Sequence, residues 1–144
     1  MSERTGSCLC GAVTVRAGIS QNEIGACHCQ QCQRWTGGGP LLSVRTDTLT
    51  LTGEAHIQEF RISEWGVRAF CRECGSNIYW RMADAPPKNI AVGLLDDQTG
   101  LKQTEEIFVD CRAPWMAPVE GASQSTEAEQ MALLDEYLKN KKDG

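Results

Sequence analysis

The chain has 144 residues, 41% of them hydrophobic and 23% charged, which is the size and composition of one soluble globular domain with a real core. Its formal net charge of -5 at pH 7 argues against a nucleic-acid-binding surface. The opening segment "MSERTGS" lacks the apolar core of a secretory signal, and no apolar run is long enough to span a bilayer, so we expect a cytoplasmic protein without a membrane partner.

Short strand-like runs follow one another along most of the chain. In "AVTVRA" apolar and polar residues alternate, as they do in a half-buried strand. Glycine, proline, aspartate and asparagine interrupt the runs. The pattern predicts a mainly β fold. Further runs lie at residues 40–45, 49–53, 56–62, 67–70, 77–81, 89–95 and 105–110.

The C-terminal part of the chain has a different pattern. Residues 118–125 are typical of a linker, and a helix signature follows, in which Thr126 and Glu129 form a capping box. Met131, Leu134 and Leu138 share one helix face. We expect a zinc-binding β domain at residues 1–117, with residues 118–144 forming a linker and an amphipathic helix packed on it; a helix that docks onto a partner is the alternative.

Eight cysteines are many for a cytoplasmic chain. A disulfide framework is one interpretation of an even number, but it needs an oxidising compartment. Seven of the eight lie in C-x-C or C-x-x-C clusters, where neighbouring thiolates can converge on one metal ion. We therefore favour metal binding. The cysteines are Cys8, Cys10, Cys27, Cys29, Cys32, Cys71, Cys74 and Cys111.

Two cysteine pairs predict a closed zinc site. Cys71 and Cys74 form a C-x-x-C knuckle followed by Gly75, which permits the positive φ of such a turn. Cys8 and Cys10 face the same side of an extended stretch and can reach the same ion. Four thiolates leave no open coordination position, so this zinc would be structural; four buried free cysteines are the alternative.

The remaining cluster has three cysteines, Cys27, Cys29 and Cys32. Three protein ligands with one open position are the pattern of a catalytic or substrate-binding zinc. Cys111 could supply a fourth ligand, but a lone cysteine in a strand is more often a small buried hydrophobe. His28 would point to the opposite strand face from its two neighbours, so we expect it to form hydrogen bonds instead of binding metal.

The segment after these cysteines, "QRWTGGGP", adds three consecutive glycines. Their backbone could approach a ligand closely, although a flexible turn is an equally good interpretation. Trp35 could line a pocket or cover the core. Arg34, Arg45 and Arg112 could each hold a substrate carboxylate or simply lie at the surface.

Four segments together resemble a known family: "CLCGAV", "CHCQQCQRWTG", "FCRECGSNIYW" and "IFVDCRAPW". They are similar, in order and spacing, to signatures of the glutathione-dependent formaldehyde-activating enzyme (GFA) family, also called centromere protein V-like, from about Ser7 to Trp115. The resemblance implies an Mss4-like β fold and carbon–sulfur lyase activity that joins glutathione to formaldehyde. It also implies two Zn²⁺ ions, a structural one at Cys8, Cys10, Cys71 and Cys74 and a catalytic one at Cys27, Cys29 and Cys32.

The open zinc position would then take a small-molecule thiol such as glutathione, whose sulfur would attack an aldehyde. Three protein thiolates make zinc a weak Lewis acid but a good carrier of a substrate thiolate, which argues against hydrolytic chemistry. The sequence singles out no general base. The alternative function is a non-catalytic, zinc-stabilised β module that binds a protein.

Overall fold

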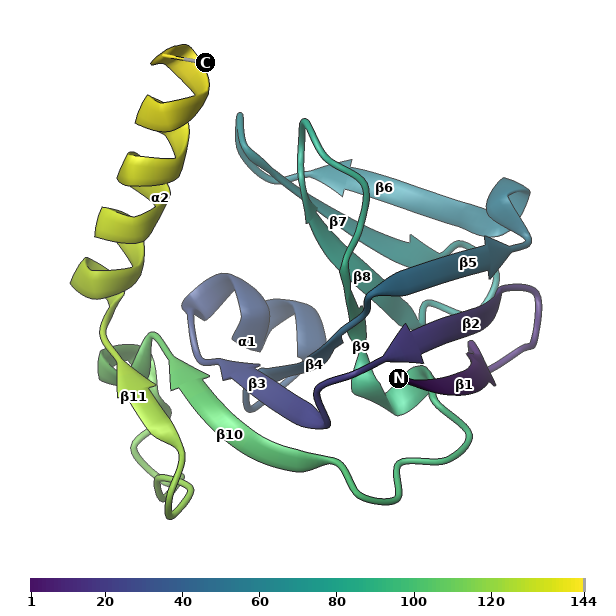
Figure 1. Cartoon of the computed structure of the whole chain (residues 1–144), viewed down its shortest axis with the longest axis horizontal. Coiled ribbons are helices and arrows are strands. Elements are labelled where there is room, and N and C mark those ends of the chain that lie inside the picture. The colour runs from purple at the N-terminus through teal and green to yellow at the C-terminus, as the bar shows by residue number, and fades with distance from the viewer. Residues whose placement is uncertain (144) are drawn as a thin grey trace. The chain divides into compact units, whose positions relative to one another are not determined.

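The structure, a computed structural model, describes residues 1–143, with side chains up to residue 141. Figure 1 labels its elements along the chain. The chain divides into two compact units, one of residues 1–24 and 42–102, the other of residues 25–41 together with the chain from residue 103 onward. Strands dominate and a helix ends the chain, so the predicted mainly β fold class with a C-terminal helix is confirmed.

The first unit contains a three-stranded antiparallel sheet of order β1-β2-β5. Its strands are β1 (Ser2–Ser7), β2 (Thr14–Ile19) and β5 (Thr48–Thr52). In β2 the residues Val15, Ala17 and Ile19 are buried while Thr14 and Arg16 are exposed, the alternation that the sequence predicts.

Five other strands of this unit are hydrogen-bonded in the order β4-β9-β8-β7-β6, and all these pairs are antiparallel. The central strands carry much of the core, including the fully buried Ala69, Cys71, Ile78 and Ile90. These strands are β4 (Leu41–Arg45), β6 (Ile57–Arg61), β7 (Gly66–Cys71), β8 (Asn77–Met82) and β9 (Asn89–Ala91), with short 3-10 turns η1 (Glu54–His56) and η2 (Val92–Leu94).

The second unit is built on strands in the order β11-β10-β3, of which β10 and β11 are parallel. Phe108 has a φ of 56°, and this left-handed residue turns the chain from β10 into η3. The elements are β3 (Glu23–Cys27), α1 (Gln30–Thr36), β10 (Lys102–Ile107), η3 (Val109–Cys111), β11 (Ser123–Ser125) and α2 (Glu127–Asp143).

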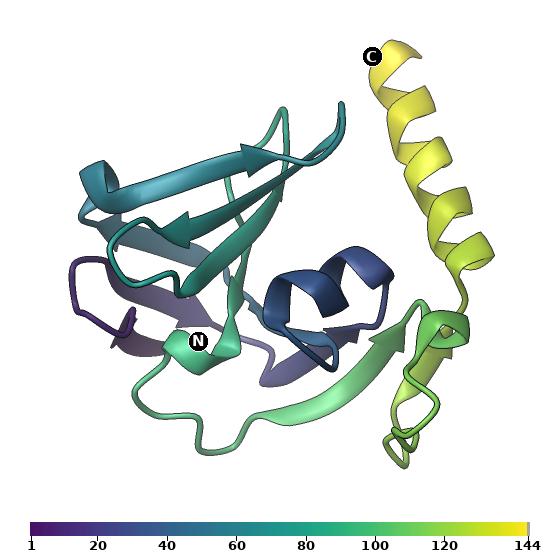
Figure 2. The same cartoon turned by 180° about the vertical axis from the view of Figure 1, so that it is seen from behind.

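The C-terminal helix α2 begins with the predicted capping box. Thr126 Oγ1 accepts the Glu129 N–H at 3.2 Å, and the Thr126 N–H donates to Glu129 Oε1 at 3.1 Å. Asp110 Oδ1 accepts the Glu127 N–H at 2.9 Å and links the helix start to η3. Figures 1 and 2 show α2 leaving the end of β11 as a straight rod. The packing of residues 118–144 on a β domain stays a prediction, and residue 144 lies outside the described residues.

Several elements differ from the expectations. Strands β1, β3 and β11 lie where no strand is predicted, and β11 falls within the predicted linker. Helix α1 lies at residues 30–36, where no helix is predicted. The expected strand at residues 105–110 ends at Ile107, so Cys111 lies in the 3-10 turn η3 and not in a strand. Helix α1 and the turn η3 both lie in the unit that holds the three-cysteine cluster. None of the described helices is both long enough and apolar enough to cross a membrane.

Candidate metal centres and substrate pocket

Cys8, Cys10, Cys71 and Cys74 come together in the first unit. Their sulfurs all lie within 4.8 Å of one another. The Cys8 and Cys10 sulfurs are 3.7 Å apart, and those of Cys10 and Cys71 are 3.8 Å apart. Zn–S bonds of about 2.3 Å in a tetrahedron place ligand sulfurs about 3.8 Å apart. The donor set and its spacing therefore fit a closed four-thiolate zinc site.

Two turns, each ending in a glycine, orient these sulfurs. Gly75 has a φ of 80°, and its N–H donates to the Cys71 carbonyl at 2.7 Å. Gly11 repeats this arrangement, with a φ of 81° and an N–H bond to the Cys8 carbonyl at 3.1 Å. The Val13 N–H also donates to Cys8 Sγ at 3.3 Å. Each pair thus closes a knuckle whose backbone requires the glycine that follows it.

The charge balance of this cluster favours a cation. Hydrogen bonds from the Ser76 side chain and backbone lower the pKa of Cys74 to about 5. The Ala12 N–H lowers the pKa of Cys10, but desolvation and the neighbouring thiols, Cys8 first among them, outweigh it and raise the pKa to about 12. Without a cation the sulfurs cannot all ionise at neutral pH, and a bound zinc ion would relieve that repulsion.

Cys27, Cys29 and Cys32 come together in the second unit, with their sulfurs within 4.8 Å of one another. Cys27 ends β3, Cys29 is the N-cap of α1, and Cys32 is in the first turn of that helix. Cys29 Sγ accepts the Cys32 N–H at 3.3 Å, as a capping side chain does. Helix capping therefore brings the two C-x-x-C sulfurs to the same side of the helix start.

Repulsion between ionised thiols is stronger in the three-cysteine cluster than in the four-cysteine cluster. The side chains of Cys29 and Cys32 raise the pKa of Cys27 far above that of a free thiol, and burial of Cys27 adds to the effect. Three thiolates this close need a positive charge among them. The donor set is soft and sulfur-rich, which suits zinc.

Cys111 does not join the three-cysteine cluster. It is half-buried in a separate group with Asp110 and Glu127, and its Sγ lies 3.9 Å from Glu127 Oε2. Burial and these carboxylates raise the pKa of its thiol. Among the described residues, no further cysteine, histidine or acidic side chain lies with Cys27, Cys29 and Cys32. The cluster thus offers three candidate protein ligands among the described residues.

His28, between two of these cysteines, forms a buried hydrogen bond as predicted. Its Nε2 lies 2.7 Å from Glu106 Oε1, and both residues are about 1% exposed. Glu106 Oε2 accepts from Arg112 Nη2 at 3.1 Å, the Val119 N–H at 3.0 Å and Gln124 Nε2 at 2.7 Å. Burial opposes ionisation of Glu106, but the hydrogen bonds outweigh it and lower the pKa to about 2.

Gln33, like Glu106, is a residue at this site that was not predicted from the sequence. Its Nε2 donates to the His28 carbonyl at 2.7 Å and to the Cys111 carbonyl at 2.8 Å. It thus ties helix α1 to the loop that carries Cys27 and Cys29 and to η3. Gln33 directly follows Cys32 in the sequence, and this position could have indicated a role near the cysteines. Nothing in the sequence near Glu106 or Gln124 indicates such a role.

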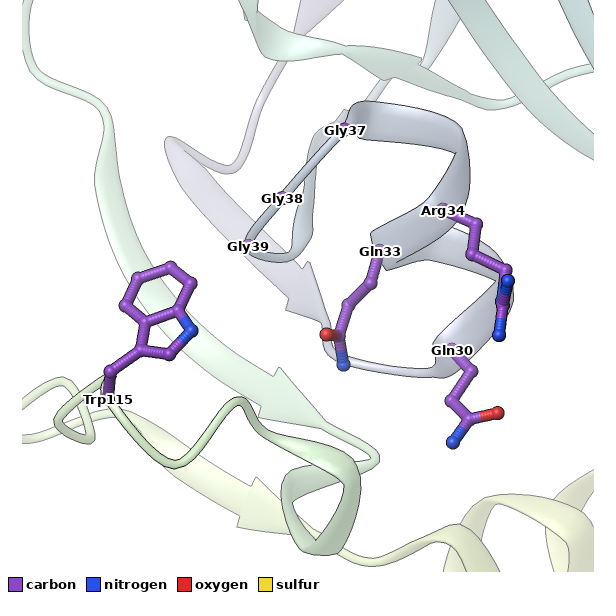
Figure 3. Close-up of a pocket in the computed structure, with 7 residues that line it drawn as sticks. All are labelled: Gln30, Gln33, Arg34, Gly37, Gly38, Gly39 and Trp115. Carbon is purple, nitrogen blue, oxygen red and sulfur yellow. The ribbon is translucent and has the colours of Figure 1, made fainter.

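A cavity of about 470 Å³ opens beside α1. Figure 3 shows Trp115 across the opening from the glycine loop, with three polar side chains extending from the helix. Trp115 is 75% exposed, so its ring is available to a ligand. This volume is that of a small-molecule site. Its lining comprises Gln30, Gln33, Arg34, Gly37, Gly38, Gly39 and Trp115.

The residues predicted around this pocket are only partly brought together. All three loop glycines have a positive φ, between 74° and 147°, so the loop needs glycine. Arg34 lines the cavity, whereas Arg112 contacts Glu106 and Arg45 lies in β4 of the other unit. Trp35 is half-buried and is not part of the lining, where Trp115 is the aromatic residue.

Comparison with known proteins agrees with the motifs. The family model described as "Glutathione-dependent formaldehyde-activating enzyme" matches residues 3–111. The chain belongs to this family. A Schizosaccharomyces pombe protein named an uncharacterized lyase is 28% identical over 80 residues, which are 56% of this chain and 58% of that relative. The match therefore spans little more than half of the relative's length.

A solved structure shows the same fold. The crystal structure of a Rhodobacter sphaeroides protein superposes with a TM-score of 0.52 at 18% identity, covering 85% of this chain and 99% of that one. The similarity concerns the fold alone. The family resemblance inferred from the motifs is confirmed by the family model.

Proposed function

We propose that this family member is a zinc-dependent carbon–sulfur lyase that forms and cleaves the adduct between a thiol, such as glutathione, and an aldehyde. The observation that carries the proposal is the convergence of Cys27, Cys29 and Cys32 without a further ligand among the described residues, at the start of the helix that lines the cavity. The family's name and the relative's description as a lyase support it.

Each chain would hold two zinc ions. Cys8, Cys10, Cys71 and Cys74 would hold a structural ion, because four sulfurs complete its coordination. Cys27, Cys29 and Cys32 would hold the catalytic one and are the proposed catalytic residues. When bound there, zinc supplies a Lewis acid that stabilises a substrate thiolate at neutral pH.

The cavity residues suit a peptide thiol with carboxylates. Arg34 can donate to a carboxylate, and Gln30 offers an amide that can donate to or accept from a peptide group. The Gly37–Gly39 loop lets a ligand approach the backbone closely because it has no side chains, although the Gly37 N–H already donates to the Gln33 carbonyl and the Gly38 N–H to Thr36 Oγ1. Trp115 can cover the bound molecule and limit the access of water.

The reaction itself balances without a redox step. In the synthetic direction the substrate sulfur forms a bond to the aldehyde carbon, the C=O π electrons move to oxygen, and the proton lost by the thiol ends on that oxygen. The lyase direction reverses these changes and breaks the C–S bond. We assign no proton transfer to His28, because it is buried and bound to Glu106.

Exchange NMR with ¹³C-labelled formaldehyde and glutathione tests the proposal, since it measures interconversion of free aldehyde and adduct at equilibrium. We expect the zinc-loaded protein to increase the exchange rate above the uncatalysed rate, and Cys29→Ser to abolish the increase. Cys111→Ser is the matched control and should retain it. A wild-type protein with two bound zinc ions that accelerates exchange for neither formaldehyde nor other aldehydes would support the alternative, a non-catalytic module.

The cytoplasmic location and the absence of nucleic-acid and membrane partners stay predictions from the sequence. The oligomeric state was not predicted.

A further inference from the structure

The Glu106 carboxylate joins two parts of the second unit, one oxygen to each. We propose that Glu106 is a positioning residue that holds the backbone of Cys27, His28 and Cys29 in the shape that brings the three sulfurs together. The same carboxylate holds the ends of the 112–119 segment, which carries the cavity residue Trp115. This inference rests on the proposed zinc site, but not on the reaction carried out there.

The first oxygen acts on the cysteine loop through His28. His28 lies between Cys27 and Cys29 in the sequence, its imidazole is buried, and Glu106 is the one hydrogen-bond partner of that ring within the described part of the chain. The backbone of the same residue is held at both ends, because its N–H donates to the Ile107 carbonyl at 3.0 Å and its carbonyl accepts from Gln33. The bond between the ring and Glu106 adds a third anchor to residue 28, next to both Cys27 and Cys29 in the chain.

The second oxygen acts on the segment that follows η3. Arg112 and the Val119 N–H donate to it from the two ends of residues 112–119, and Gln124 donates from β11. Both ends of the 112–119 segment are therefore bound to the same buried carboxylate oxygen. Burying a carboxylate is unfavourable unless hydrogen bonds surround it, and four donors satisfy that condition here. Through these bonds Glu106 connects the residue between Cys27 and Cys29 to the segment that carries Trp115.

Ligand-orienting hydrogen bonds of this kind strengthen metal binding. A ligand set that is already in place does not have to be ordered when the ion binds, and loss of an outer partner typically weakens metal affinity by about 10–100-fold. Glu106 reaches the proposed ligands through His28, and its hydrogen-bond partners are His28, Arg112, the Val119 N–H and Gln124, so its effect would be positional.

The test is zinc affinity measured by competition with a chromophoric chelator, together with the visible spectrum of the Co²⁺-substituted protein. In Glu106→Ala we expect the second zinc equivalent to bind about 10–100-fold more weakly and the Co²⁺ d–d bands of the three-sulfur site to change. The first equivalent, at the four-cysteine site, should bind as in the wild type.

Glu106→Gln keeps the size of the side chain, so zinc affinity can be measured in this variant even if Glu106→Ala does not fold. Its amide has one acceptor oxygen for four donors, so we expect a smaller loss, about tenfold, in the same zinc equivalent. Glu59→Gln is the matched control: Glu59 also has a pKa lowered to about 2 and binds Arg81 and Tyr79, but it lies in the first unit. It should leave the second zinc equivalent unchanged.

Two results would overturn the inference: unchanged second-site affinity and Co²⁺ spectrum in Glu106→Gln, or an equal weakening by Glu59→Gln. The inference and the proposed function fail separately. A wild-type protein that binds the second zinc but lacks lyase activity contradicts only the function, whereas a wild-type protein without a second zinc contradicts both.

Discussion

Replacement of Cys111 by serine should leave the coordination of the two proposed zinc ions unchanged. Sulfurs that share a tetrahedral zinc ion lie about 3.8 Å apart. The sulfurs of Cys27, Cys29 and Cys32 form one group within 4.8 Å, whereas Cys111 Sγ belongs to another group, with Glu127. The 3.9 Å contact between Cys111 and Glu127 is a weak one, so its loss should change zinc affinity by no more than about twofold.

Zinc-edge absorption spectroscopy measures the consequence directly. With four sulfurs at one site and three at the other, the wild type and Cys111→Ser should both show an average of about 3.5 sulfur ligands per zinc. Added glutathione should raise both averages toward about 4. An average of about 4 in the wild type without thiol, falling in Cys111→Ser, would show that Cys111 is a ligand and would refute the reasoning.

Cys29→Ser is the matched comparison for the same measurement. Serine is a good N-cap residue, so it can still accept the Cys32 N–H and preserve the start of α1. The substitution therefore removes a metal ligand with little effect on the helix. We expect loss of the second zinc ion while the first remains bound.

Three further predictions concern the backbone, the pH dependence and the cavity. Gly53→Ala should destabilise the zinc-loaded protein by about 3 kcal/mol or more in urea unfolding, because φ is 87° and the new Cβ would lie 2.0 Å from a backbone oxygen. Gly100→Ala, with a φ of 84° and open space, should cost only about 1 kcal/mol; equal losses would contradict this steric argument. Hydrogen bonds from Arg81 lower the pKa of Glu59 to about 2, below the value in the unfolded chain. The contribution of Glu59 to stability is therefore complete above pH 4.5 and is lost as the pH falls toward 2. Because the side chain is 36% exposed, we expect only about 1 kcal/mol, which Glu59→Gln should remove from the pH profile of unfolding; parallel profiles would count against it. Arg34→Gln should raise the KM for glutathione about tenfold with kcat unchanged, whereas the control Arg45→Gln should not; an unchanged KM in the first variant would remove Arg34 from the substrate site.

The knuckle at Cys71–Cys74 was predictable because its geometry is local: it depends on the C-x-x-C spacing and on the following glycine, which has a positive φ in the structure. Cys8 and Cys10 were expected on one side of an extended stretch, but they lie in a turn that the Gly11 N–H closes by donating to the Cys8 carbonyl. That the two pairs share one site was also expected, since the remaining cysteines form a cluster of their own. The structure brings the same four sulfurs together.

Helix α1 was not predicted, although its sequence lies inside the motif. It has seven residues, too few for a helical period to stand out, and its N-cap is Cys29, whose residue type is not among the usual capping residues. The capping bond nevertheless brings the Cys29 and Cys32 sulfurs to the same side of the helix start. The prediction of a three-sulfur group rested on spacing alone and did not include this cause.

The sequence by itself determined most of the strand pattern, the family and the arrangement of seven cysteines as two pairs and a cluster of three, because those features depend on neighbours a few residues apart. Only the tertiary structure decided where Cys111 lies and which acid binds His28. Glu106 is 78 residues from His28 and is one of many carboxylates in the chain. A left-handed turn at Phe108 takes Cys111 into η3, toward Glu127. Contacts over such separations depend on how strands pair and chains turn, which spacing along the sequence does not record.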